Sequence, residues 1–281
     1  MGKFTGVLLA SDFDNTLVYT EEALRRGEGV PQLTEKNKAA LEYFMAEGGR
    51  FTVATGRALA AFLLYAKSVP SNAPGIVCNG AAMYDYAQGK YLEANMLDEL
   101  ARDRGQEVLE AFPAVAAEAY HIDNVIHAVH PNEVVRQHIR ITKVTVTESP
   151  SLSVVPVPLG KILFEGEHED LEQARNFMVE RGWDKDYELI FSGKNLLEMT
   201  VKGANKGGML RRLAAHLGIS MDHVYCAGDE ANDISMLTVA AQGFAPANCI
   251  EAVRNCGATI VSHAKDDAMA DIIAILDKKY S

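Results

Sequence analysis

The chain has 281 residues, of which 48% are hydrophobic, and its formal net charge is −11 at pH 7. This length suits one large domain or two smaller ones, and the acidic balance disfavours nucleic acid as a partner, because phosphate backbones are bound by dense Lys and Arg surfaces. The four cysteines form no C-x-x-C pair and no apolar run is long enough to span a membrane, so we expect a cytoplasmic protein with reduced thiols and no membrane partner.

Strands and helices alternate in the first part of the chain. The expected elements are strands at residues 6–12, 50–55 and 75–79 and helices at residues 34–46 and 59–66. Thr34 is the expected N-cap of the first helix. Strands that are uniformly apolar and separated by helices are typical of a parallel sheet with helices on both faces.

The middle of the chain has a different pattern. Several of its strands alternate between apolar and polar residues, as the strands of an antiparallel sheet with one solvated face do. The expected strands are residues 89–94, 125–130, 143–149, 160–166 and 195–201, and the expected helices lie near residues 97–111 and 168–181. We therefore expect residues 84–200 to form an α+β cap domain that is inserted into the first domain.

The last part of the chain returns to alternating helices and apolar strands. The expected elements are a helix at residues 205–217, a strand at 223–229, helical segments at 231–240 and 249–255, a strand at 258–262 and a helix at 267–279. The predicted fold class is α/β, with a doubly wound, Rossmann-like parallel-sheet core formed by residues 1–83 and 201–281 and an inserted α+β cap.

Polar residues follow three of the predicted core strands and open one of the core helices. They are Asp12 and Asp14, the run Thr55-Gly56-Arg57, Asp229 with Asp233, and Lys206. Taken singly, each has an ordinary structural explanation, such as a turn, a helix cap or a solvated lysine. Because ligands bind at the carboxyl ends of parallel strands, their occurrence in this order predicts one shared crevice.

The chemistry of these residues is complementary. Four carboxylates in one crevice require a cation, and oxygen ligands suit Mg²⁺, while Lys206 and the amides near Gly56 suit a phosphate dianion. Asp12 would then attack phosphorus as a carboxylate nucleophile, and Asp14 would protonate the leaving alcohol. Phosphate monoesters need accelerations of up to roughly 10²¹-fold, and one general acid supplies only about 10² to 10⁴, so charge stabilisation must supply much of the remainder.

The segments DFDNT, TGR, NKGG and GDEAND resemble the four motifs of the haloacid dehalogenase superfamily of phosphotransferases. With CNGA at residues 78–81 and ANKGGMLRRLAAHLGI at residues 204–219, the chain is most similar to the Cof-type, sugar-phosphatase-like branch. The resemblance implies that Asp12 is the nucleophile and Asp14 the acid/base. It also implies phosphate binding by Thr55, Gly56 and Lys206, Mg²⁺ binding by Asp12, Asp14, Asp229 and Asp233, and substrate-facing positions for Arg57, Asn79 and Asn232.

Three features depart from the branch or stay outside its motifs. Asn15 stands where the branch often has Gly, and residues 18–32 are longer than usual. We favour a solvated, charged loop for residues 18–32 over a mobile loop at the mouth of the active site. The four histidines of the predicted cap lack a metal-binding helix motif, and we expect surface or packing roles for them; they are His121, His127, His130 and His138.

The sequence favours a Mg²⁺-dependent phosphatase that hydrolyses a small phosphorylated metabolite, preferably a sugar phosphate, through an aspartyl-phosphate. One alternative is a phosphomutase that uses the same intermediate and returns the phosphoryl group to a sugar. A receiver-like regulatory module is disfavoured, because receivers lack both a cap and an acid/base beside the phosphoacceptor. The sequence leaves open the substrate and the choice between a monomer and a homodimer.

Overall fold

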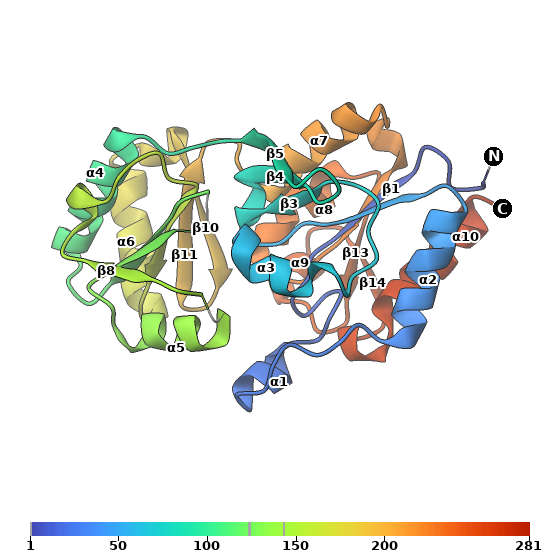
Figure 1. Ribbon diagram of the computed structural model, residues 1–281, viewed down its shortest axis with the longest axis horizontal. Coiled ribbons are helices and arrows are strands. Elements are labelled where there is room, and N and C mark those ends of the chain that lie inside the picture. Colours follow the sequence, from blue (N-terminus) through green and yellow to red (C-terminus); the bar gives the residue numbers. More distant parts are fainter. Residues whose placement is uncertain (1, 123–124, 143) are drawn as a thin grey trace.

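The computed structural model describes residues 2–122, 125–142 and 144–281. Two bodies lie side by side along its long axis, and both chain termini lie at the outer end of one of them, which we call the core (Figure 1). The core sheet consists of β1 (Leu8–Ser11), β2 (Arg50–Val53), β12 (Val224–Ala227), β13 (Gln242–Pro246) and β14 (Thr259–Val261). Its strands are parallel and follow the order β14-β13-β12-β1-β2, so β1 lies inside the sheet.

Helices pack on both faces of the core sheet. The described helices of the core are α1 (Glu21–Arg25), α2 (Glu35–Ala46), α3 (Leu59–Ala66), α7 (Lys206–Leu217), α8 (Ile234–Val239), α9 (Glu251–Arg254) and α10 (Ala268–Lys279). Leu9 packs in a cluster with residues of α2, α3 and α10, whereas its neighbours Leu8 and Ala10 pack with α7, α8 and α9. Successive residues of a strand point to opposite faces, so these two clusters are the two sides of a doubly wound sheet.

A small antiparallel sheet extends the core toward the second body. It contains β3 (Gly75–Val77), β4 (Ala82–Asp85) and β5 (Lys90–Ala94). A single parallel bridge between Ala54 and Ile76 connects it to the end of β2. The expected domain boundary at residues 83 and 84 falls within β4, and this boundary stays a prediction.

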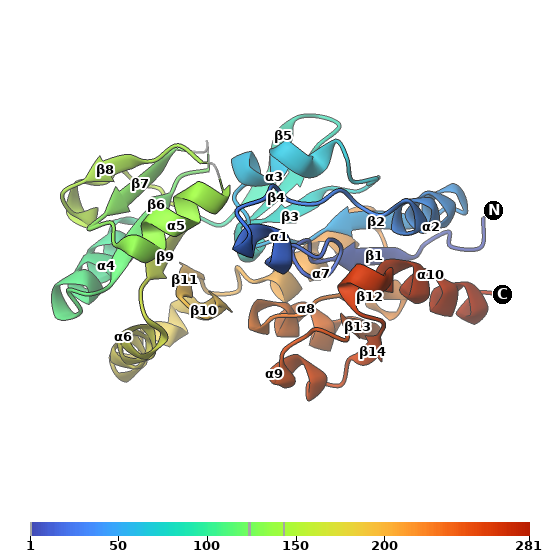
Figure 2. The same ribbon diagram turned by 90° about the horizontal axis from the view of Figure 1, so that it is seen from below.

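The second body, which we call the cap, is built on a sheet of six strands in the order β10-β11-β9-β6-β7-β8 (Figure 2). Its strands are β6 (Ala116–Tyr120), β7 (Ile126–Val129), β8 (Thr147–Ser149), β9 (Lys161–Glu165), β10 (Tyr187–Gly193) and β11 (Leu196–Val201). The pairs are antiparallel except for β7 with β8. The predicted fold class, a parallel-sheet core with a separate α+β cap, is confirmed.

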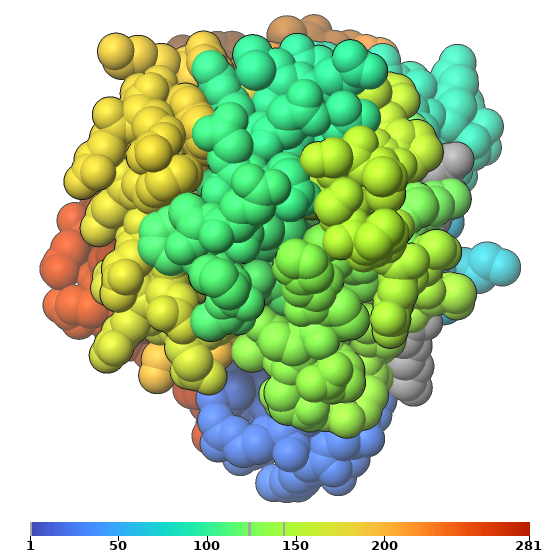
Figure 3. Space-filling model, turned by 90° about the vertical axis from the view of Figure 1, so that its left-hand side faces the viewer, coloured from blue at the N-terminus to red at the C-terminus, as the bar shows by residue number. Residues whose placement is uncertain are grey.

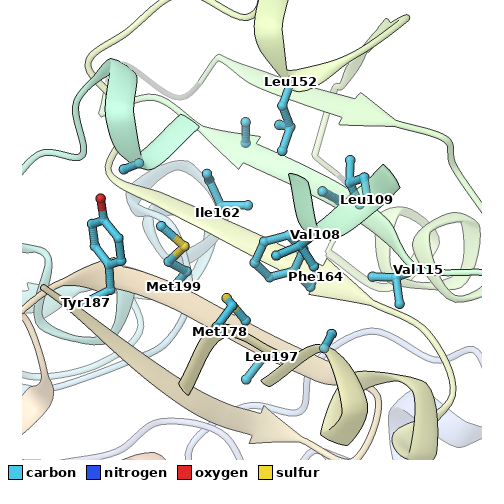
Figure 4. Packing of buried hydrophobic residues seen from close by; sticks show 14 of the residues in the cluster. Val108, Leu109, Val115, Leu152, Ile162, Phe164, Met178, Tyr187, Leu197 and Met199 are labelled. Atoms are coloured by element: carbon cyan, nitrogen blue, oxygen red, sulfur yellow. The ribbon is translucent and has the colours of Figure 1, made fainter. Parts of the chain in front are cut away.

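The cap has its own hydrophobic core between the sheet and two helices, α4 (Glu99–Ala111) and α6 (His168–Glu180). Figure 4 shows Ile162 and Phe164 of β9 packed with Leu197 and Met199 of β11 and with Met178 of α6. The alternate residues of these strands, such as Lys161 and Leu163, point to the opposite face. That opposite face is partly covered by a third helix, α5 (Glu133–Thr142).

Several described elements were not expected from the sequence. They are α1, α5, β4, β6, β10 and β13. β6 has the sequence AAEAY, in which alanine has a low strand propensity. The expected strand at residues 143–149 is shorter, because β8 begins at Thr147, and Lys143 lies outside the described residues.

Charged side chains are buried on the face of the cap sheet that carries α5. His138 Nδ1 lies 3.1 Å from Glu118 Oε2 and 3.4 Å from Glu165 Oε1, and both glutamates are fully buried. Burial would lower the pKa of His138, but the hydrogen bonds and charges of Glu118 and Glu165 outweigh it and raise that pKa to about 9. His138 therefore has a partner role that its isolated position in the sequence did not indicate.

This cluster predicts that the cap loses stability as pH rises. The folded-state pKa of His138 is above its ordinary value, so its contribution to stability is complete below pH ~6.5 and is lost as pH rises to about 9. We expect wild type to lose up to roughly 3 kcal/mol more than His138→Gln between pH 6 and pH 9.5. Urea unfolding at these two pH values measures the difference, with the exposed His216→Gln as control; equal pH dependence in wild type and His138→Gln would contradict the ion-pair assignment.

Candidate active site

Asp12 follows β1 directly, at the carboxyl end of the strand that lies inside the core sheet. Its backbone N–H donates to the carbonyl of Ala227 at 2.9 Å, and the Ser11 hydroxyl donates to the carbonyl of Asp12 at 2.7 Å. The next side chain, Phe13, is buried among the rings of α3. These contacts fix the backbone on both sides of Asp12, so its carboxylate is held in one place at the edge of the sheet.

Asn15 forms the turn after Asp14 and also caps the following helix. Its φ is +56°, a left-handed conformation that Asn adopts more readily than most residues. Its side-chain Oδ1 accepts hydrogen bonds from the N–H groups of Thr20 and Glu21, at 3.1 and 2.9 Å. Asn15 therefore fulfils the conformational role of the Gly that the related branch often has, and in addition fixes the start of α1.

Lys206 is the first residue of α7 and is 1% exposed. Its Nζ donates to Asp12 Oδ1 at 2.7 Å and to Asp233 Oδ1 at 2.6 Å. Burial would lower the pKa of Lys206, but the two carboxylates outweigh this effect and raise it. Gly207 allows α7 to approach α8 closely, because a Cβ there would lie 2.1 Å from the carbonyl oxygen of Ser235 in the first turn of α8.

The loop after β12 brings two more aspartates to the same point. Asp233 Oδ2 accepts the backbone N–H groups of Asp229 and Glu230, at 2.9 and 3.0 Å, which fixes the loop. Asp229 Oδ1 accepts the hydroxyl of Thr16 at 2.5 Å. Only glycine fits at Gly228, because a Cβ there would lie 2.4 Å from the Asp233 side chain.

The three aspartates carry more negative charge than one lysine balances. Asp12, Asp229 and Asp233 are 7%, 4% and 0% exposed, and each offers a carboxylate oxygen within 4.8 Å of the others. Burial raises the pKa of Asp12 to about 7 although Lys206 opposes it, and burial together with the charges of Asp12 and Asp233 raises the pKa of Asp229. An oxygen-only donor set with excess negative charge fits Mg²⁺.

Asp14 lies two residues after Asp12 and is held by an arginine. Arg57 Nε and Nη2 donate to the two carboxylate oxygens of Asp14, each at 2.7 Å, and form a bidentate pair. The guanidinium carbon lies 5.4 and 5.2 Å from the ring centroids of Phe13 and Tyr65. Arg57 was expected to face the substrate, and this stays a prediction; Arg57 lines the cavity and also orients the side chain of the expected acid/base.

The segment Thr55-Gly56-Arg57 packs on the turn after β3. Asn79 donates its backbone N–H to the Thr55 carbonyl at 3.1 Å, and its side-chain oxygen accepts from Asn232 Nδ2 at 2.8 Å. Asn79 has a φ of +54° and is 1% exposed, and a Cβ on Gly56 would lie 3.1 Å from its side chain. The structure thus brings all ten predicted residues to one end of the sheet, with the pair Asn79–Asn232 behind the segment that is expected to bind phosphate.

A cavity of about 360 Å³ extends from these residues to the cap. Its core side includes Asp12, Asp14, Thr55, Gly56, Arg57 and Asn232, and its cap side includes Tyr120, His138, Lys161, Ser192 and Glu198. Lys161 Nζ donates to the carbonyl of Gly56 at 3.1 Å and lies 3.1 Å from Glu198 Oε1, so it connects the two bodies. Sequence reasoning missed the cap residues; the available signal was the presence of charged residues in two strands that are otherwise mostly apolar, β9 and β11.

Residues 18–32 also reach this cavity. Thr20 and Leu24 line it, and α1 lies beside α5 of the cap, as the blue and light-green segments at the lower edge of Figure 3 show. The segment was expected to be a solvated, charged loop. That prediction holds for the exposed side chains of Glu21, Glu22 and Arg25, but one side of the helix forms part of the cavity wall.

Among the described residues, no helix has the length and apolar character needed to cross a membrane.

The family model of haloacid dehalogenase-like hydrolases matches residues 9–273. The chain is 26% identical to the pyridoxal phosphate phosphatase YbhA of Escherichia coli, over 95% of this chain and 97% of that protein. It is 24% identical to the 5-amino-6-(5-phospho-D-ribitylamino)uracil phosphatase YwtE of Bacillus subtilis, over 92% of this chain and 93% of that protein.

Solved structures show the same fold. A haloacid dehalogenase-like hydrolase from Bacteroides thetaiotaomicron superimposes with a TM-score of 0.79 at 20% identity, over 96% of this chain and 99% of that chain. A sugar phosphatase of subclass IIB of the same superfamily gives a TM-score of 0.80 at 20% identity, with the same coverage. The chain therefore belongs to the haloacid dehalogenase-like hydrolases and is a phosphatase of their Cof type.

Proposed function

We propose that this phosphatase depends on Mg²⁺ and transfers the phosphoryl group of a small phosphorylated metabolite first to Asp12 and then to water. The observation that carries the proposal is the ammonium group of Lys206 between Asp12 and Asp233, with Asp229 beside them. The names of the two full-length relatives refer to pyridoxal phosphate and to a phosphoribitylamino-uracil, which supports a small phosphorylated metabolite as substrate. The sugar phosphate expected from the sequence is one member of this class.

In the proposed reaction, Asp12, Asp229 and the Asp14 carbonyl would hold Mg²⁺, with Asp233 supporting them, and the bound cation would neutralise charge on the phosphate. Thr55, the amide of Gly56 and Lys206 bind the phosphate oxygens. A carboxylate oxygen of Asp12 attacks phosphorus while the leaving oxygen takes a proton from Asp14. Water then attacks the aspartyl-phosphate, Asp14 accepts its proton, and inorganic phosphate leaves with Asp12 restored.

The proposal assigns different tasks to the two bodies. Residues 1–83 and 201–281 supply the nucleophile, the acid/base and the phosphate and metal ligands. Residues 84–200 form a cap that closes the cavity from the other side and selects the leaving group. The hydrogen bond from Lys161 to Gly56 supports this arrangement, since it connects the cap to the segment expected to bind phosphate. Closure of this kind excludes water from the reacting groups.

Replacement of the proposed nucleophile tests the mechanism. Asp12→Asn should lower kcat for p-nitrophenyl phosphate by about a thousandfold or more, because no covalent intermediate can form, while the circular dichroism spectrum stays that of wild type. The exposed Asp103→Asn is the matched control and should keep wild-type turnover. Retained activity in Asp12→Asn would refute the mechanism.

The fate of the phosphoryl group separates the proposed hydrolase from the alternatives. With a saturating metabolite such as a sugar phosphate, we expect one inorganic phosphate for each substrate consumed. Consumption without phosphate release would indicate a phosphomutase. A slowly decaying aspartyl-phosphate without steady-state turnover would indicate a receiver-like module.

Removal of the divalent ion tests the proposed cofactor. Dialysis against EDTA should abolish phosphatase activity, and added Mg²⁺ should restore it, because the aspartates alone repel a phosphate dianion. Asp229→Asn should raise the Mg²⁺ concentration that gives half-maximal activity, since it removes one ligand charge. Full activity of the EDTA-treated protein in metal-free buffer would contradict the proposal.

Lys206 should matter for stability as well as for turnover. Lys206→Gln leaves Asp12 and Asp233 buried without their cation, and the loss of one partner from a buried ion pair costs about 3–5 kcal/mol. Urea unfolding without Mg²⁺ measures this loss. The half-exposed Lys202→Gln serves as control and should change the free energy of unfolding by less than about 1 kcal/mol. An unchanged midpoint for Lys206→Gln would contradict the observed bridge.

A further inference from the structure

The cap side of the cavity offers few polar groups to a substrate. Lys161 binds Glu198 and the Gly56 carbonyl, and Ser192 donates its hydroxyl to Glu198 Oε1 at 2.7 Å. The Tyr120 hydroxyl donates to Glu118 Oε2. Each of these polar side chains that line the cavity therefore already binds another group of the protein.

The other polar side chains on the cap side of the cavity also have partners within the protein or are buried. The Thr142 hydroxyl donates to the His138 carbonyl at 2.8 Å, and His138 Nδ1 lies between Glu118 and Glu165. Glu198 Oε2 has no partner among the described residues, but this oxygen is itself buried and does not reach the cavity surface. Most polar side-chain atoms that a substrate group meets on the cap side are thus occupied or covered; the exception is His138 Nε2, which has no hydrogen-bond partner among the described residues.

The surfaces between these groups are apolar, and they come from both bodies. Leu24 of α1 and Ala58 and Ala61 at the start of α3 line the cavity from the core. Ile141 of α5, Leu163 of β9 and Leu196 of β11 line it from the cap. Ala58, Tyr120, Leu163 and Leu196 also pack together in one hydrophobic cluster across the boundary between core and cap. The cavity therefore has a charged end at the aspartates and largely apolar walls beyond them.

We propose that the part of the substrate that leaves with the alcohol oxygen is an apolar, ring-bearing group rather than a polyhydroxylated sugar. The inference rests on the proposed phosphatase function and replaces the sugar phosphate expected from the sequence. A hexose phosphate would bring several hydroxyls against walls that offer partners to few of them, and each unpaired hydroxyl costs about tenfold in binding. An apolar ring has no hydroxyls that need partners, and the burial of its surface against the apolar walls increases its binding affinity.

The test compares two phosphate esters of primary alcohols, 2-phenylethyl phosphate and glucose 6-phosphate. Their leaving groups are chemically similar, so a difference in kcat/KM reports recognition in the cavity rather than leaving-group chemistry. We expect the wild-type protein with Mg²⁺ to release inorganic phosphate from 2-phenylethyl phosphate with a kcat/KM at least tenfold higher. Equal values, or a preference for glucose 6-phosphate, would overturn the inference.

A pair of variants locates the preference in the cavity. Ile141→Asn places an amide in the apolar wall and should lower the ratio of the two kcat/KM values at least fivefold. Val154→Asn is the matched control, because Val154 is 61% exposed in the cap and lies outside the cavity, and it should leave the ratio unchanged. An equal effect of the two variants would also overturn the inference. If Ile141→Asn does not fold, the wild-type comparison decides alone.

Hydrolysis of p-nitrophenyl phosphate separates this inference from the proposed function. Turnover of that ester, dependent on Asp12, together with a preference for glucose 6-phosphate would retain the phosphatase and reject the apolar substrate class. Absence of phosphate release from all three esters in the presence of Mg²⁺ would reject both.

Discussion

The arrangement of the site depends on one ammonium group in a buried set of carboxylates. Lys206 is held at the first turn of α7, and its two hydrogen bonds join Asp12 at the end of β1 to Asp233 at the start of α8. Asp233 in turn fixes the loop that carries Asp229. Because these segments are far apart in the sequence, the lysine can bridge them only if the parallel sheet places β1 and β12 side by side, as their register shows. The pairing of β1 with β12 therefore positions the charged residues of the site, and the contacts of Lys206 in turn hold the ends of these strands together.

The core was largely predictable from the sequence because its signals are local and repeated. Most buried strands of the parallel sheet are short apolar runs, and three of them, β1, β2 and β12, end at a polar motif that marks the carboxyl end of the strand. Asp12, Thr55 and Asp229 could be placed at one edge of the sheet by this rule alone. The bidentate pair of Arg57 with Asp14 could not be predicted, since it depends on how the turn at Asn15 aims a side chain across the crevice.

The buried charged residues of the cap were less predictable than the core, because their partners lie far away in the sequence. Its sheet buries one face under α4 and α6 and presents the other to the cavity, so Lys161, Glu198 and Glu118 are charged residues on strands that would ordinarily expose them to water. Their partners come from other strands and from α5, at separations that no periodicity encodes. The sequence therefore indicated an inserted α+β unit but not that its buried charged residues pair with one another. That mutual pairing is what leaves an apolar surface opposite the phosphate end of the cavity.

The proposed mechanism requires that Asp12 becomes phosphorylated during turnover. The most direct measurement is to quench the reacting protein with acid, reduce it with sodium borohydride, and locate the reduced residue by peptide mass spectrometry. An aspartyl-phosphate is reduced to homoserine, whereas a free carboxylate is not. We expect homoserine at position 12, formed only when substrate and Mg²⁺ are both present. Homoserine at another aspartate, or an unmodified peptide from protein that is turning over substrate, would contradict it.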